Sequence, residues 1–195
     1  MESKQYSIYL LGQKNQMSTL AVNTIQAQTG TTVSVTSGQV LHAPGHVIQT
    51  VSGTYSTAGS TVSTTAVQAW TGVSITPKFS TSLIKVECNW YCMHSDYYDG
   101  YAQIYRNGTG ISGQRKVIRN TGHTGGSFVS AESRYAWYCP AWLWSFTEAA
   151  GSTSQITYSI YCWTQNAGQT TWWNDAYNNI QENPTSTMIL TEIAQ

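Results

Sequence analysis

The stretch Leu83–His94, LIKVECNWYCMH, decides the fold class. Apolar side chains recur at every second position of this stretch, namely at Ile84, Val86, Cys88, Trp90 and Cys92. Because a period of two places successive side chains on opposite faces of a β-strand, the stretch predicts a strand with one buried and one outward face.

The neighbouring residues extend this pattern into a hairpin. Residues 101–106 form the next expected strand, and it ends at Asn107-Gly108, a dipeptide typical of tight hairpin turns. Further strands are expected over 45–55, 67–75, 116–119, 128–131, 136–146, 155–164 and 187–193. We therefore predict an all-β protein, an antiparallel β-sandwich of jelly-roll-like form.

Composition excludes several classes of partner. The chain has 195 residues, of which 9% are charged, with a net charge of +0. Soluble domains usually carry about 25% charged residues, so the polar surface here is made of hydroxyl and amide groups. We expect no nucleic-acid binding, because no broad basic face is available to neutralise phosphates. No apolar run reaches the roughly 20 residues that span a bilayer, and we expect neither membrane insertion nor a signal peptide.

Residues 1–44 differ in composition from the rest of the chain. They contain no Trp and no Cys, and residues 29–38 form a Thr, Ser, Val and Gly tract without bulk for a core of its own. The sequence predicts an extended N-terminal arm or docking segment over 1–44, followed by the β-sandwich domain over 45–195.

The cysteines and the few acidic residues do not form a recognisable metal or redox site. Cys88 and Cys92 would lie about 13 Å apart in a strand, too far for a disulfide or a shared zinc ion. We interpret them as reduced thiols of the core in a protein assembled in cytoplasm, with a bridge from Cys139 or Cys162 across the sheets as the alternative. No metal and no cofactor is expected. The loop from His94 to Gly100 is interpreted as a turn, with a cation site as the alternative.

No catalytic motif is present, and we expect that the protein is not an enzyme. The chain lacks a nucleophile elbow, a phosphate-binding loop and a zinc-protease motif. A polysaccharide depolymerase would need a carboxylate pair, and Asp96 with Asp99 or Glu87 with Glu132 are the pairs available.

The many aromatic residues, among them 8 Trp and 13 Tyr, are the feature of the sequence that says most about binding. Over residues 158–163 Tyr158, Ile160 and Cys162 share one face and Tyr161 and Trp163 share the other, so at least one of the two sets meets solvent or another subunit. Aromatic rings beside amides and hydroxyls suit sugar recognition, whereas a subunit interface buries the same residue types. The candidate glycan ligands are Trp172, Trp173, Tyr177, Tyr97 and Tyr98, with Trp172-Trp173 expected in a loop. The candidate interface residues are Trp90, Trp137 and Trp163.

Four segments resemble tail-fibre proteins of marine bacteriophages. They are MSTLAVNTIQ (17–26), ITPKFSTSLIKV (75–86), YRNGT (105–109) and TMILTEIAQ (187–195). Residues 1–16 precede the start usual in that family, and Lys78 stands where a small residue is usual.

The resemblance implies a homotrimeric structural protein of the virion. In such a fibre residues 1–44 would dock on other virion proteins, and the β-sandwich would contact the host surface, with glycans as the expected receptor. The alternative is an adaptor, a capsid decoration or a stabilising protein that binds no receptor.

Overall fold

A computed structural model describes residues 43–94, 99–118, 141–175 and 184–195, all within the compact unit Val40–Gln195. The described residues form ten strands and no helix, which confirms the all-β prediction. The strands are β1 (Val47–Tyr55), β2 (Gly59–Thr61), β3 (Val67–Ile75), β4 (Leu83–His94), β5 (Gly100–Arg106), β6 (Thr109–Ile118), β7 (Ala141–Ala149), β8 (Ile156–Thr164), β9 (Thr171–Trp173) and β10 (Ser186–Ile193). The strand expected over 128–131 and the first residues of the one expected over 136–146 lie outside the described residues.

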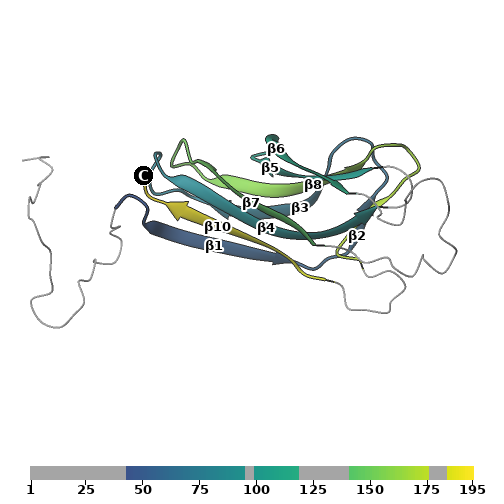
Figure 1. Ribbon diagram of the computed structural model, residues 1–195, viewed down its shortest axis with the longest axis horizontal. Coiled ribbons are helices and arrows are strands. Elements are labelled where there is room, and N and C mark those ends of the chain that lie inside the picture. The colour runs from purple at the N-terminus through teal and green to yellow at the C-terminus, as the bar shows by residue number, and fades with distance from the viewer. Residues whose placement is uncertain (1–42, 95–98, 119–140, 176–183) are drawn as a thin grey trace, which may run out of the picture. The chain divides into compact units, whose positions relative to one another are not determined.

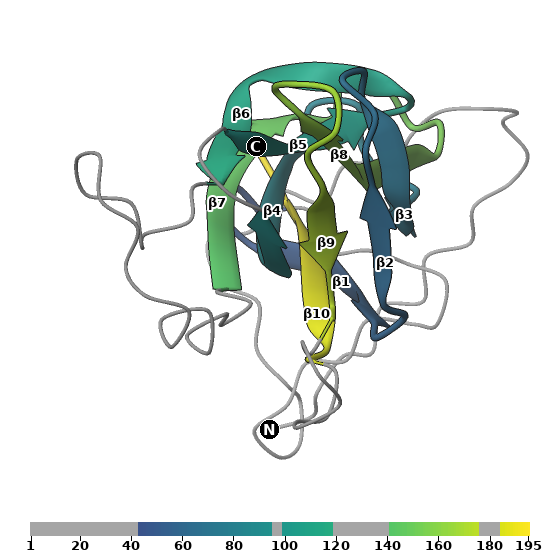
Figure 2. The same cartoon turned by 90° about the vertical axis from the view of Figure 1, so that its right-hand side faces the viewer.

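Two antiparallel sheets pack as a sandwich (Figure 1). The first sheet has the order β1-β10-β4-β9-β2, with β7 on the other edge of β4, and the second has the order β3-β8-β5-β6. β10 pairs with residues 83–89 of β4 and β9 pairs with residues 92–94, so β9 and β10 are two parts of one interrupted strand, in line with each other in Figure 2. β1 and β2 divide a second strand in the same way.

Counting each interrupted strand once gives four strands per sheet and the topology of a jelly roll. In chain order the strands are then β1/β2, β3, β4, β5, β6, β7, β8 and β9/β10. The first sheet has the order β1/β2, β9/β10, β4, β7 and the second has the order β3, β8, β5, β6, which is the arrangement that two Greek keys produce. The jelly-roll prediction is therefore confirmed for the described residues.

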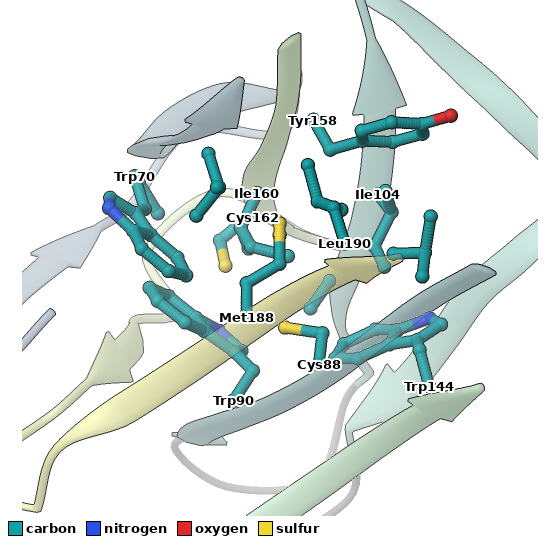
Figure 3. Close-up of a cluster of buried hydrophobic side chains, with 14 of the residues drawn as sticks. Trp70, Cys88, Trp90, Ile104, Trp144, Tyr158, Ile160, Cys162, Met188 and Leu190 are labelled. Atoms are coloured by element: carbon teal, nitrogen blue, oxygen red, sulfur yellow. The ribbon is translucent and has the colours of Figure 1, made fainter. Parts of the chain in front are cut away.

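The inner face of β4 supplies the middle of the core, as its alternation predicted. Ile84, Val86, Trp90 and Cys92 are 0% exposed and Cys88 is 3% exposed. Figure 3 shows Cys88 and Cys162 among Trp90, Met188 and Ile160, side chains that come from both sheets. Burial raises the pKa of the Cys88 thiol to about 12, so this group stays protonated at neutral pH. The three described cysteines are core thiols, as predicted.

A cluster of four aromatic rings, which we call the aromatic cluster, lies in the core beside these thiols. Tyr55, Trp70 and Trp90 form a triangle with all three ring centroids 5.7 to 6.2 Å apart, and Trp173 lies 6.5 Å from Trp90. The four rings come from β1, β3, β4 and β9, so the cluster joins the two sheets of the sandwich.

Three of the four segments that resemble tail fibres lie in the described part of the sandwich, and their side chains form its polar anchors. Glu192 is 0% exposed, and its carboxylate accepts the backbone N–H groups of Lys78 at 2.8 Å and Phe79 at 3.2 Å. Gln49 Nε2 donates to the second carboxylate oxygen at 2.6 Å. Glu192 therefore ties the loop after β3 to the last strand of the chain.

The predicted hairpin turn is confirmed by its backbone. Asn107 and Gly108 both adopt positive φ, 49° and 79°, and they join β5 to β6. The side chain of Asn107 accepts the N–H of Thr157 at 2.8 Å, which fixes the turn against β8. No helix of the described residues is long and apolar enough to cross a membrane.

Candidate binding surfaces

The outer face of the second sheet carries a set of aromatic side chains that we call the aromatic face. Because Ala102, Ile104, Ile160 and Cys162 point into the core, the alternate residues of β5 and β8 point outward. The aromatic face consists of Tyr101, Gln103 and Tyr105 of β5, Tyr161 and Trp163 of β8, and Arg115 and Val117 of β6.

Strand register brings these residues into rows. Tyr101 lies opposite Trp163 on one side and Val117 on the other. Gln103 lies between Tyr161 and Arg115 in the next row. The aromatic face therefore extends across three adjacent strands.

The rings of the aromatic face stack on one another. Tyr105 and Tyr161 have centroids 3.9 Å apart at an interplanar angle of 20°, and Tyr101 and Trp163 have centroids 5.2 Å apart. The guanidinium of Arg115 lies 5.2 Å from the centre of the Tyr101 ring. Stacking covers one face of each of these four rings, so no ligand fits between the rings of the Tyr105–Tyr161 pair.

Hydrogen bonds and burial fix the aromatic face further. Gln103 Nε2 donates to the carbonyl of Ile111 at 2.8 Å, which orients the amide between the rings. The pKa of the Tyr105 hydroxyl is raised, first by burial and then by the neighbouring Tyr161. The outward residues of the aromatic face include one cation, Arg115, and no carboxylate.

The two tryptophans proposed as glycan ligands lie in a strand. Trp172 and Trp173 belong to β9, which pairs with β2 and with the end of β4, and the expectation of a loop is wrong. Trp173 is 7% exposed and stacks against Trp90 in the aromatic cluster, so it offers no surface to a ligand. Trp172 points to the opposite side of β9 and is half-buried.

Trp90, proposed as an interface residue, is also a core residue. It is 0% exposed and stacks between core rings, because it belongs to the inner alternation of β4. Trp163 does lie on an outer face, as expected. Trp137, Tyr97, Tyr98 and Tyr177 lie outside the described residues.

Of the segment interpreted as a turn, His94 and Asp99 lie among the described residues. His94 is the last residue of β4, is 2% exposed, and has its Nδ1 3.0 Å from Thr171 Oγ1. Asp99 N–H donates to Gln165 Oε1 at 3.1 Å, and Asp99 carbonyl accepts the N–H of Gln165 at 2.8 Å. Asp96 lies outside the described residues, and those that are described hold no cluster of three potential metal ligands.

The described glutamates all have structural partners. Glu87 pairs with Lys85 at 2.9 Å on the outer face of the first sheet. Glu148 accepts Arg106 at 3.0 Å and the Tyr158 hydroxyl at 2.5 Å. Burial, followed by the bond to Glu148, raises the pKa of Tyr158. Glu132, the partner suggested for Glu87, lies outside the described residues.

The sequence analysis singled out Tyr161 and Trp163 and missed the other five residues of the aromatic face. The alternation Tyr101, Gln103, Tyr105 opposite Ala102 and Ile104 was a readable signal for an outward aromatic row. The pairing of β5 with β8, which are separated by β6 and β7 in the chain, had no local signal.

Comparisons with known proteins leave the family open. No family model matches the chain, and no curated protein matches it. Among solved structures, the infectious bursal disease virus VP2 subviral particle aligns at 12% identity with a TM-score of 0.31. That alignment covers 84% of this chain and 42% of the VP2 chain, so the chain spans less than half the length of that protein.

Proposed function

We propose that the chain is a non-enzymatic structural protein of a bacteriophage virion, a tail fibre or related fibre. Residues 1–44 attach it to the particle, and copies of the chain, three in the family that it resembles, present the jelly roll to the host surface and its glycans. The observation that carries the proposal is the aromatic face, an ordered surface of rings, hydroxyls and amides with a single charge. Such a surface suits association with other nearly uncharged protein surfaces, as in a fibre built from several copies of one chain.

The engaged carboxylates support binding over hydrolysis. Glycoside hydrolysis needs one carboxyl group as an acid and a second as a base or nucleophile. Glu87, Glu148 and Glu192 instead hold a lysine, an arginine with a tyrosine, and two backbone N–H groups.

The first test asks whether the chain is part of the virion. Antibody raised against the purified chain should label intact phage particles at a fixed position in electron micrographs. Particles that carry no label, while the protein is abundant in the infected cell, would contradict the proposal.

The second test uses the adjacent tryptophans of β9 as a matched pair. Phage carrying Trp172→Ala should assemble normally and adsorb to host cells more weakly, because Trp172 points outward. Trp173→Ala removes a core ring and should reduce the melting temperature of the purified chain. Unchanged adsorption of the Trp172→Ala phage would remove this residue from the receptor site.

One observation favours the second candidate, an adaptor or decoration protein without receptor binding. Sugar rings stack on exposed ring surfaces, and two ring pairs of the aromatic face already cover one another. Purified chain that labels particles but does not compete with phage for adsorption would support this candidate.

A further inference from the structure

The aromatic face has the properties of a surface that is covered in the working molecule. It lies on the outer side of a four-stranded sheet, and Tyr, Trp and Arg, the types enriched in protein interfaces, make up most of it. Val117, which lies opposite Tyr101, is 38% exposed. The question is which occupant fits this surface.

We propose that the aromatic face is the contact between copies of this chain. The inference rests on the proposed function in one respect, that the chain works as an oligomer. It assigns that contact to the second sheet, with Tyr101, Tyr105, Tyr161 and Trp163 at its centre.

The stacking geometry favours a protein partner over a sugar. The 3.9 Å separation of Tyr105 and Tyr161 leaves no room for a ligand between the two rings. Tyr101 is covered by Trp163 on one side and approached by Arg115. Tyr and Trp side chains combine a large apolar ring with a hydroxyl or N–H group, so they pack and hydrogen-bond well against another sheet or loop.

The same geometry lowers the cost of association. Stacking restricts the rings, and the hydrogen bond to the Ile111 carbonyl restricts the Gln103 amide. These side chains therefore lose few rotamers when a partner covers them. Loss of side-chain freedom is one of the main costs of forming an interface. The aromatic face is therefore organised for binding before the partner arrives.

The charge of the aromatic face points to a second copy of this chain. Its outward residues include no carboxylate, and its cation, Arg115, lies on the edge strand β6 over a tyrosine ring. The partner surface should therefore be nearly uncharged. The chain itself meets this requirement, with 9% charged residues and a net charge of +0.

The size of the aromatic face suits a specific but modest contact. The aromatic face occupies three of the four strands of the second sheet. The whole outer face of that sheet, four strands about 4.8 Å apart and about nine residues long, presents roughly 500 to 600 Å² per copy. Two such surfaces together reach about 1,100 Å², close to the lower bound for specific interfaces. We therefore expect an association that depends on protein concentration.

The test compares two exposed aliphatic residues on opposite sheets of the full-length chain. Val117 is 38% exposed on the aromatic face, and Ile189 is 39% exposed on the outer face of the first sheet. Both are β-branched strand residues, so Val117→Lys and Ile189→Lys introduce the same charge at the same exposure. Sedimentation velocity over a range of concentrations gives the mass of each variant.

The expected result is an oligomeric wild type, an oligomeric Ile189→Lys variant and a monomeric Val117→Lys variant. A lysine forced against the neighbouring copy should raise the dissociation constant at least roughly a hundredfold. A wild-type dimer means that the aromatic face meets itself, and a trimer means that it meets another surface of the neighbour. Both masses support the inference.

Four outcomes overturn the inference. They are a wild type that is monomeric throughout, oligomers that persist in both variants, dissociation of both variants, and dissociation of Ile189→Lys alone. Circular dichroism verifies that each variant is folded, and Gln68→Lys, an exposed residue opposite Tyr161 on β3, replaces Val117→Lys if that variant unfolds. Virion labelling remains a separate test, so a particle-bound chain without this contact refutes the inference and leaves the proposed function standing.

Discussion

Glu192 shows how a single charge is used in a chain with so few. Its carboxylate is fully buried, and two backbone N–H groups and one amide satisfy it. Replacing Glu192 with Ala leaves the N–H groups of Lys78 and Phe79 without their acceptor. We expect the free energy of unfolding in urea to fall by about 2 kcal/mol.

Glu87→Ala is the matched control for this prediction. Glu87 forms an ion pair with Lys85, but both side chains are about 40% exposed, so solvent screens the pair. Its loss should cost less than about 0.5 kcal/mol. Equal effects of the two substitutions would mean that Glu192 is no anchor.

The Cys88 thiol makes stability depend on pH in the alkaline range. Its pKa is about 12 in the folded chain and 9.0 when unperturbed, so the unfolded chain ionises first. Stability from this group is complete below pH 9 and is lost as the pH rises toward 12. Between pH 8 and pH 10 the wild type should lose about 1 kcal/mol more than Cys88→Ala. Identical pH slopes in urea unfolding would contradict this.

The burial of single residues could be predicted from the sequence where the alternation of apolar and polar residues continued over many positions. The alternation of β4 runs without a break from Leu83 to Cys92, and the inner five residues were predicted correctly as core. The same alternation also placed Trp90 inside, and the interface expected there conflicted with it. β9 has only three residues, too few to show a period, so nothing in the sequence separated buried Trp173 from outward Trp172.

At the scale of elements, two glycines with the same backbone angle have different roles. Gly72 in β3 has φ +83°, and a Cβ there would lie 1.6 Å from the carbonyl oxygen of Tyr158. Gly108 has φ +79° with open space around it. Gly108→Ala should cost about 1 kcal/mol of stability, from backbone strain alone. Gly72→Ala should cost at least about 2 kcal/mol more, because β3 must move away from β8.

Thermal unfolding of the two glycine variants measures this difference directly. Similar melting temperatures would show that β3 accommodates a side chain at its irregular register near Gly72. The wild-type chain provides the reference, and near-ultraviolet circular dichroism reports whether Trp70, two residues away, keeps its place in the aromatic cluster.

The interrupted strands mark the limit of what local sequence could reveal. β9 and β10 both pair with β4, and Tyr91 lies opposite the break between them. Its N–H donates to Ser186 Oγ at 3.0 Å, and its carbonyl accepts the N–H of Asn174 at 3.1 Å. Asn174, at φ 47°, ends β9 in the left-handed region. Strand order between segments so far apart comes from packing, which a local pattern does not report.

At the scale of the whole molecule, the proposed contact between copies and the proposed host-contact site would cooperate through avidity. If copies join through the second sheet, several weak receptor sites act on one particle-bound fibre. Linked sites can bind roughly 100- to 10,000-fold more tightly than one site without any new contact. A variant that only dissociates the copies should therefore lose adsorption while each copy keeps its own receptor site.

Val117→Lys tests this prediction because it is distant in the fold from Trp172, on the opposite sheet. The purified variant should bind host cells far more weakly than wild type when free in solution. Beads that carry the Val117→Lys variant at high density present many copies at once without the contact between copies. These beads should bind host cells nearly as strongly as beads that carry the wild-type chain. Beads carrying Trp172→Ala should stay weak at any density, since the receptor site itself is altered. If dense Val117→Lys beads also fail to bind, the aromatic face contacts the receptor directly and the division of roles between the two sheets is wrong.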